Sequence, residues 1–108
     1  MVLILTSETR KDSNWVPFEI RYAVDECKMP IIAAYPDQGP IYEPNELKSI
    51  WPEALAVRIR DNVARVIHIP FKKAVLAGAL SQFDVQNLPG SALTYYTKKA
   101  YQSFGQEP

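Results

Sequence analysis

The chain has few residues of several types, and each shortage excludes a class of protein. Among its 108 residues there is one cysteine, Cys27, which excludes an internal disulfide and a cysteine-rich zinc site. There is one histidine, His68, so a metal site built from several histidines is impossible. Twelve basic residues balance twelve acidic ones, and a formal charge of zero gives no electrostatic reason to expect nucleic acid. We therefore expect neither a metal site nor a nucleic-acid partner.

Long apolar runs and the common nucleotide or hydrolase motifs are missing as well. No apolar run reaches the roughly 18 residues that span a bilayer, and residues 1–5 lack the basic segment that begins a signal peptide. Glycine-rich dinucleotide and phosphate loops, the HExxH zinc motif and the GxSxG hydrolase motif do not occur. With 47% hydrophobic and 22% charged residues, the sequence predicts one globular domain over residues 1–108, cytoplasmic and without membrane contact.

Three short apolar runs predict β-strands near residues 2–6, 31–35 and 65–69. Each run is continuous instead of alternating between apolar and polar residues. Continuous runs are typical of strands that are covered on both faces, as in a parallel sheet. Three parallel strands are therefore expected.

Helical patterns lie between and after these runs. We expect helices from Asn14 to about Lys28, after Pro52, over residues 72–83 and over residues 97–104. The first has its apolar positions on one face: Val16, Ile20, Ala23, Val24 and Cys27. The alternation of strands and helices predicts a three-layer α/β fold with right-handed crossovers.

The first predicted strand has an uncovered edge. It begins at residue 2, with nothing before it in this sequence to pair with it. An apolar, unpaired strand edge tends to pair with another chain. We expect a homo-oligomer, or pairing with a complementing chain, through the edge of residues 2–6.

Residues 15–20, with the sequence WVPFEI, are the strongest candidate for chemistry. Helical spacing puts Trp15, Glu19 and Tyr22 on one line beside the apolar face. A carboxylate among aromatic rings near the end of a strand is expected in a partly desolvated pocket. Such a pocket strengthens its interaction with a developing positive charge or a sugar hydroxyl. The alternative is a solvated glutamate on a surface helix.

Other reactive residue types favour structural roles. His68 stands in an apolar strand, where a hydrogen-bonded core or edge position is expected and a role as a base or ligand is the alternative. Cys27 falls on the buried face of the first helix and is expected to be inert. Tyr95, Tyr96 and Tyr101 either pack a last helix or stack on a base.

The segment from the first strand to the second resembles the second half of TIR-like domains, in particular the branch of the bacterial Thoeris anti-phage proteins. The resemblance rests on residues 13–20 (SNWVPFEI) and 30–35 (PIIAAY), and it covers roughly residues 2–70. In TIR domains a tryptophan four residues before a glutamate opens the helix after the third strand. That glutamate is catalytic in the NAD-cleaving members. Trp15 and Glu19 match this pair, and Val16 stands where a cysteine is common.

The resemblance implies a flavodoxin-like fold whose five-stranded parallel sheet is incomplete here, with three parallel strands. It implies NAD as a substrate, not a cofactor, in an anti-phage or signalling protein. Glu19 would be the catalytic carboxylate that stabilises an oxocarbenium-like transition state while the nicotinamide–ribose bond breaks. Trp15 and Tyr22 would shape the substrate pocket, and a missing half or a neighbouring subunit would complete it.

Two other functions are consistent with the sequence. The first is a catalytically silent TIR-like module that assembles through its sheet edge and helices. The second is a receiver-like regulator, for which the expected acidic residue at the end of the first strand is missing.

Overall fold

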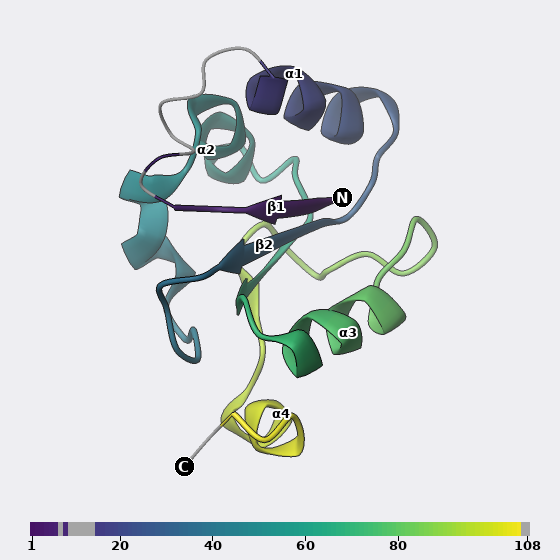
Figure 1. The fold of residues 1–108 in the computed structure, drawn as a ribbon. Coiled ribbons are helices and arrows are strands. Elements are labelled where there is room, and N and C mark those ends of the chain that lie inside the picture. The colour runs from purple at the N-terminus through teal and green to yellow at the C-terminus, as the bar shows by residue number, and fades with distance from the viewer. Residues whose placement is uncertain (7, 9–14, 107–108) are drawn as a thin grey trace.

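Four parallel strands form one sheet in the part of the chain that the computed structural model describes, residues 1–6, 8 and 15–106 (Figure 1). The strands are β1 (Val2–Ile4), β2 (Ile31–Tyr35), β3 (Val66–Pro70) and β4 (Thr94–Tyr95), and they lie in that order across the sheet. One row of the register runs from Leu3 through Ala33 and His68 to Tyr95. The prediction of an α/β fold with a parallel sheet is therefore confirmed.

The predicted number of strands is wrong, because β4 is a fourth. It has two residues, Thr94 and Tyr95, which pair with Ile67 and His68 of β3. Two residues are too short to show a hydrophobic period, so the backbone pairing left no signal in the sequence. The first strand is also shorter than residues 2–6, although the Leu5 N–H still donates to the Ala34 carbonyl at 2.8 Å.

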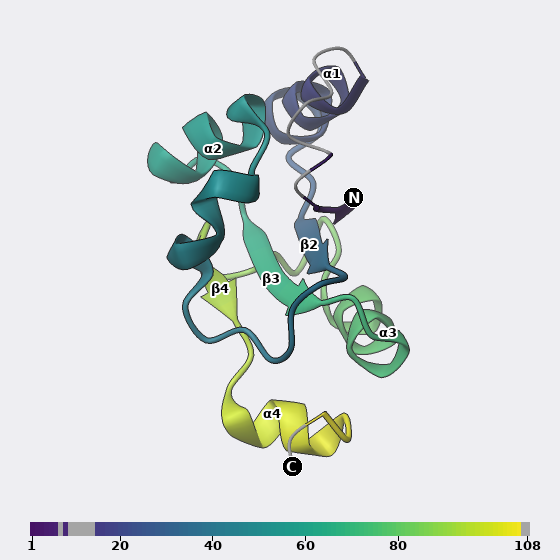
Figure 2. The same ribbon diagram turned by 60° about the vertical axis from the view of Figure 1, so that its left-hand side comes forward.

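Helices cover both faces of this sheet (Figure 1). On one face lie α1 (Trp15–Arg21), the π-helix η2 (Tyr22–Glu26), the 3-10 helix η3 (Pro44–Ile50) and α2 (Glu53–Arg60). On the other lies α3 (Lys73–Gln82), and α4 (Lys98–Ser103) contributes to the same core cluster. Figure 2 shows α3 beside the sheet and α4 beyond the ends of the strands. All residues of β2 and β3 are buried between these two layers, which is why their sequences are apolar except for His68.

The connection from β3 to β4 departs from the expected handedness. Each connection moves one strand further in the same direction across the sheet. The helices α1 and α2 pack on one face, whereas α3 packs on the opposite face. The third connection therefore has the opposite hand to the first two, and the expectation of right-handed crossovers throughout is wrong.

The first helical segment changes its winding at Tyr22, where the α-helix gives way to the π-helix η2. This change keeps Ala23 and Val24 buried but leaves Cys27 partly exposed, unlike the continuous helix expected to about Lys28. The segment ends at Glu26, and Lys28, just past the Cys27 C-cap, has a left-handed φ of 53°.

The helices α3 and α4 pack closely at one glycine. A Cβ atom added at Gly78 of α3 would lie 2.5 Å from a ring carbon of Phe104, just after α4. Gly78 therefore provides room for the ring of Phe104.

The last helix, α4, begins and ends as its sequence predicts. The Thr97 side chain accepts from the Ala100 N–H, and Gly105 has a φ of +73°.

Candidate functional site

The predicted site residues lie on the outer surface of α1 and η2. Glu19 is in the second turn of α1 and its side chain is exposed, and Tyr22 is 57% exposed. The backbone of Trp15 begins α1, and its side chain lies outside what the structure describes. The described residues therefore give Glu19 no desolvated pocket of the kind that the sequence led us to expect.

A shallow hollow does occur on this surface, beside Glu19 in sequence. Its lining residues are Phe18, Arg21, Tyr22, Asp25 and Glu26, and Glu19 is not among them. Phe18 is 59% exposed, so two aromatic rings, those of Phe18 and Tyr22, are available to a partner or a ligand here.

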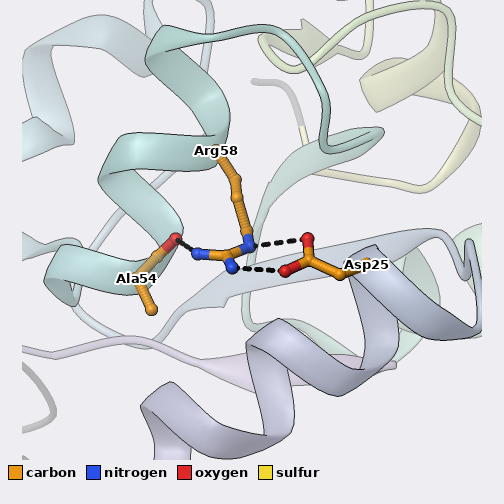
Figure 3. Close-up of polar contacts among 3 residues, drawn as sticks. All are labelled: Asp25, Ala54 and Arg58. Atoms are coloured by element: carbon orange, nitrogen blue, oxygen red, sulfur yellow. Dashed lines mark hydrogen bonds and ion pairs between the residues drawn. The ribbon is translucent and has the colours of Figure 1, made fainter.

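An arginine fork fixes η2 to α2 (Figure 3). Arg58 donates from Nε to Asp25 Oδ1 at 3.1 Å and from Nη2 to Asp25 Oδ2 at 2.6 Å. Its Nη1 donates to the Ala54 carbonyl at 3.0 Å. The hydrogen bonds from Arg58 hold the pKa of the Asp25 carboxyl below its usual value. These hydrogen bonds hold η2, which carries Tyr22, against α2.

A chain of buried hydrogen bonds crosses the layer between α2 and the sheet. Trp51 Nε1 lies 2.9 Å from Tyr35 Oη, which lies 2.7 Å from His68 Nδ1. His68 Nε2 lies 2.9 Å from the Ala92 carbonyl oxygen. An indole N–H can only donate and a carbonyl can only accept, so Nε2 carries a proton, and Nδ1 of a neutral imidazole must then accept. Trp51 donates to Tyr35, Tyr35 donates to Nδ1, and Nε2–H donates to Ala92.

His68 is a neutral imidazole above its lowered pKa, with both ring nitrogens bonded. Burial lowers its pKa to about 4, although the hydrogen bond to the Ala92 backbone acts in the opposite direction. Burial also raises the pKa of the Tyr35 hydroxyl. The prediction of a hydrogen-bonded core histidine is confirmed.

The tyrosines near the C-terminus divide between core and surface. Tyr101 is fully buried, and its hydroxyl accepts from the Ile41 N–H at 3.1 Å and donates to the Ile41 carbonyl at 3.2 Å. Tyr96 is buried against it, with ring centroids 6.1 Å apart. Tyr95 is 47% exposed. Packing is therefore confirmed for Tyr96 and Tyr101.

Two glutamates after β2 form a feature that the sequence analysis missed. Glu43 and Glu46 line a hollow at the carboxyl end of the strands, together with Gln38, Pro40, Ile41, Tyr42 and Leu47. A hydrogen bond to Glu43 and the charge of that neighbour raise the pKa of Glu46. The i, i+3 spacing of two acids around Pro44 was the available signal. The two carboxylates make this hollow unsuited to a phosphate group.

The outer edge of β1 has no partner strand among the described residues. The Ile32 N–H donates to the Met1 carbonyl and the Leu5 N–H to the Ala34 carbonyl, so odd-numbered residues bond to β2. In a parallel ladder the groups of the intervening residues point the other way. The N–H and C=O of Val2 and Ile4 therefore face the open edge.

The side chains of β1 add an apolar surface to that edge. Leu3 is buried on the face covered by α1 and α2. Val2 and Ile4 alternate to the other face, where they are 37% and 46% exposed. An open backbone edge beside two exposed β-branched residues has the form of a strand-pairing site.

Within the described part of the chain, no helix is long and apolar enough to cross a membrane, and no three metal-binding side chains cluster. Comparison of the chain with protein-family models, with curated proteins and with solved structures finds no match.

Proposed function

We propose that this chain is an assembly module that pairs with a second copy of itself through the outer edge of β1. The observation that carries the proposal is the open edge of β1, with the outward backbone groups and exposed side chains of Val2 and Ile4. Strand addition to such an edge takes its affinity from main-chain hydrogen bonds and its specificity from alternate side chains.

A second copy fits this edge by symmetry. A two-fold axis beside β1 brings the same edge of two chains together, so each Ile4 meets the apolar side chains of the other copy. The pairing satisfies the outward N–H and C=O groups and covers Val2 and Ile4. In TIR-like domains, which this chain resembles, further strands pair beyond the edge that corresponds to β1. The resemblance therefore supports this edge as the pairing surface.

We expect Ile4→Lys to abolish self-association, because a charged side chain on an edge strand blocks pairing. Light scattering should give the native chain twice its 12.2 kDa mass at high concentration, and the variant a single mass. Val85→Lys is the matched control, because Val85 is 60% exposed and lies outside the sheet. A native chain that stays monomeric at high concentration contradicts the proposal.

NAD cleavage is a second candidate function, and the position of Glu19 favours it. The helix α1 follows β1 in a parallel sheet, and Glu19 lies in its second turn, where the resemblance puts the catalytic residue. The exposed rings of Phe18 and Tyr22 lie nearby on the same surface. Glu19 then acts only when a neighbouring chain completes the pocket.

In this case the associated chain releases nicotinamide from NAD, and Glu19→Gln lowers the rate at least about a hundredfold, because the transition state loses its stabilising carboxylate. Asp37→Asn is the control, since Asp37 is also an exposed acid but does not line the hollow that contains Phe18 and Tyr22. Free nicotinamide is measured by chromatography. Turnover that survives Glu19→Gln excludes Glu19 as the catalytic residue. Absence of turnover in every oligomeric state excludes NAD cleavage and favours the catalytically silent assembly module.

A further inference from the structure

A second binding surface lies on the face of the sheet away from the side chains of Val2 and Ile4. It is a hollow of about 650 Å³ between η3 and α2, and Leu93 closes one side just before β4. Figure 2 shows η3 and α2 next to each other, with β4 close by. We refer to it as the η3–α2 hollow, and its lining residues are Asn45, Lys48, Ser49, Trp51, Glu53, Ala56, Val57, Ile59, Arg60 and Leu93.

The floor of the η3–α2 hollow is apolar. Trp51 is 4% exposed, and its indole N–H is already donated inward to Tyr35. The buried indole therefore closes the floor of the hollow and offers a ligand no hydrogen-bond donor. The walls of the hollow add three aliphatic side chains, those of Val57, Ile59 and Leu93. Such a surface favours a flat apolar body, which can pack against Val57 and Leu93 and exclude water.

The rim of the η3–α2 hollow carries more positive than negative charge. Lys48 and Arg60 line it, against one acid, Glu53. Among the described residues, the Lys48 side chain makes no ion pair or hydrogen bond. Arg60 uses Nε for Asp61 Oδ1 at 3.3 Å, and both partners are largely exposed. Two cations above an apolar floor complement an anionic group on a ligand.

We propose that the η3–α2 hollow binds a small molecule with a flat apolar body and one anionic group, with the body against Val57 and Leu93 and the anion between Lys48 and Arg60. The volume is in the range of ordinary small-molecule sites, about 300–1,000 Å³. The proposal is independent of the pairing of β1, because neither Val2 nor Ile4 lines this hollow.

Two fluorescent probes of similar shape test the proposal on the full chain. Anilinonaphthalene sulfonate has an aromatic body and one anionic group, whereas N-phenylnaphthylamine is uncharged. We expect the double variant Lys48→Gln, Arg60→Gln to weaken the sulfonate about tenfold and to leave the uncharged probe unchanged. The control Lys72→Gln, Lys73→Gln removes the same charge from exposed residues at α3 and should change neither affinity.

The location of binding is tested separately. Val57→Trp fills the hollow and should abolish binding of both probes, while circular dichroism confirms that the variant is folded. Methyl chemical shifts that change at Val57, Ile59 and Leu93 on adding the sulfonate support the site. Sulfonate binding that persists in Val57→Trp, or that falls equally in the Lys72 and Lys73 control, overturns the proposal. Methyl chemical-shift changes centred on Val2 and Ile4 would also overturn the proposal.

Discussion

Replacing Tyr35 with phenylalanine should lower the free energy of unfolding by about 2–4 kcal/mol, because the change leaves two buried groups without partners. Trp51 Nε1–H loses its acceptor, and His68 Nδ1 loses its donor. In the native chain, no buried side-chain nitrogen or oxygen among the described residues lacks a hydrogen bond. The cost is large because the hydroxyl serves two partners at once.

Urea unfolding followed by fluorescence measures this effect. Tyr95→Phe is the matched control, because Tyr95 is 47% exposed and removal of its hydroxyl leaves no buried group unpaired. A Tyr35→Phe variant as stable as the Tyr95→Phe control would show that the hydrogen-bonded chain from Trp51 to His68 does not form.

Acidification should lower the stability of the native chain by about 3 kcal/mol between pH 6.5 and pH 4, through His68 alone. Burial lowers the His68 pKa to about 4 in the folded chain, from an ordinary value of 6.5. Between these values the unfolded chain binds a proton that the folded chain does not. Stability therefore falls as the pH falls through this window, and above about pH 6.5 His68 has no effect on the pH dependence.

The variant His68→Gln isolates this contribution, because its amide can donate and accept but does not titrate in this range. We compare the loss of unfolding free energy between about pH 7 and pH 4.5 in the two chains. The carboxylates titrate in both chains and contribute equally to both losses. The difference between the two losses of unfolding free energy is therefore the contribution of His68. Equal losses in the native chain and in His68→Gln would contradict the neutral, buried imidazole.

The strands and most helices could be predicted from local pattern, because burial on both faces leaves a continuous apolar run. The runs at residues 31–35 and 65–69 match β2 and β3 to within one residue. The strand β4 escaped prediction because its two residues are held by backbone bonds to β3, which any sequence can make. The π-helix η2 escaped it because periodicity assumes one winding throughout.

The candidate sites depended on contacts between residues far apart in the chain. The partners of His68 come from 33 and 24 residues away, so its burial could be expected but its tautomer could not. Helical spacing put Glu19 beside the apolar face of its helix. It could not show that this flank is exposed, since that depends on how α1 and α2 pack together.

Amide hydrogen exchange at Ile4 tests the pairing of β1 most directly. The Ile4 N–H points to the open edge, whereas the Leu5 N–H is bonded to the Ala34 carbonyl and serves as the internal reference. We predict that the Ile4 amide exchanges rapidly in dilute protein and becomes protected as the concentration rises, while Leu5 stays protected throughout. An Ile4 amide that exchanges rapidly at every concentration would contradict assembly through this edge.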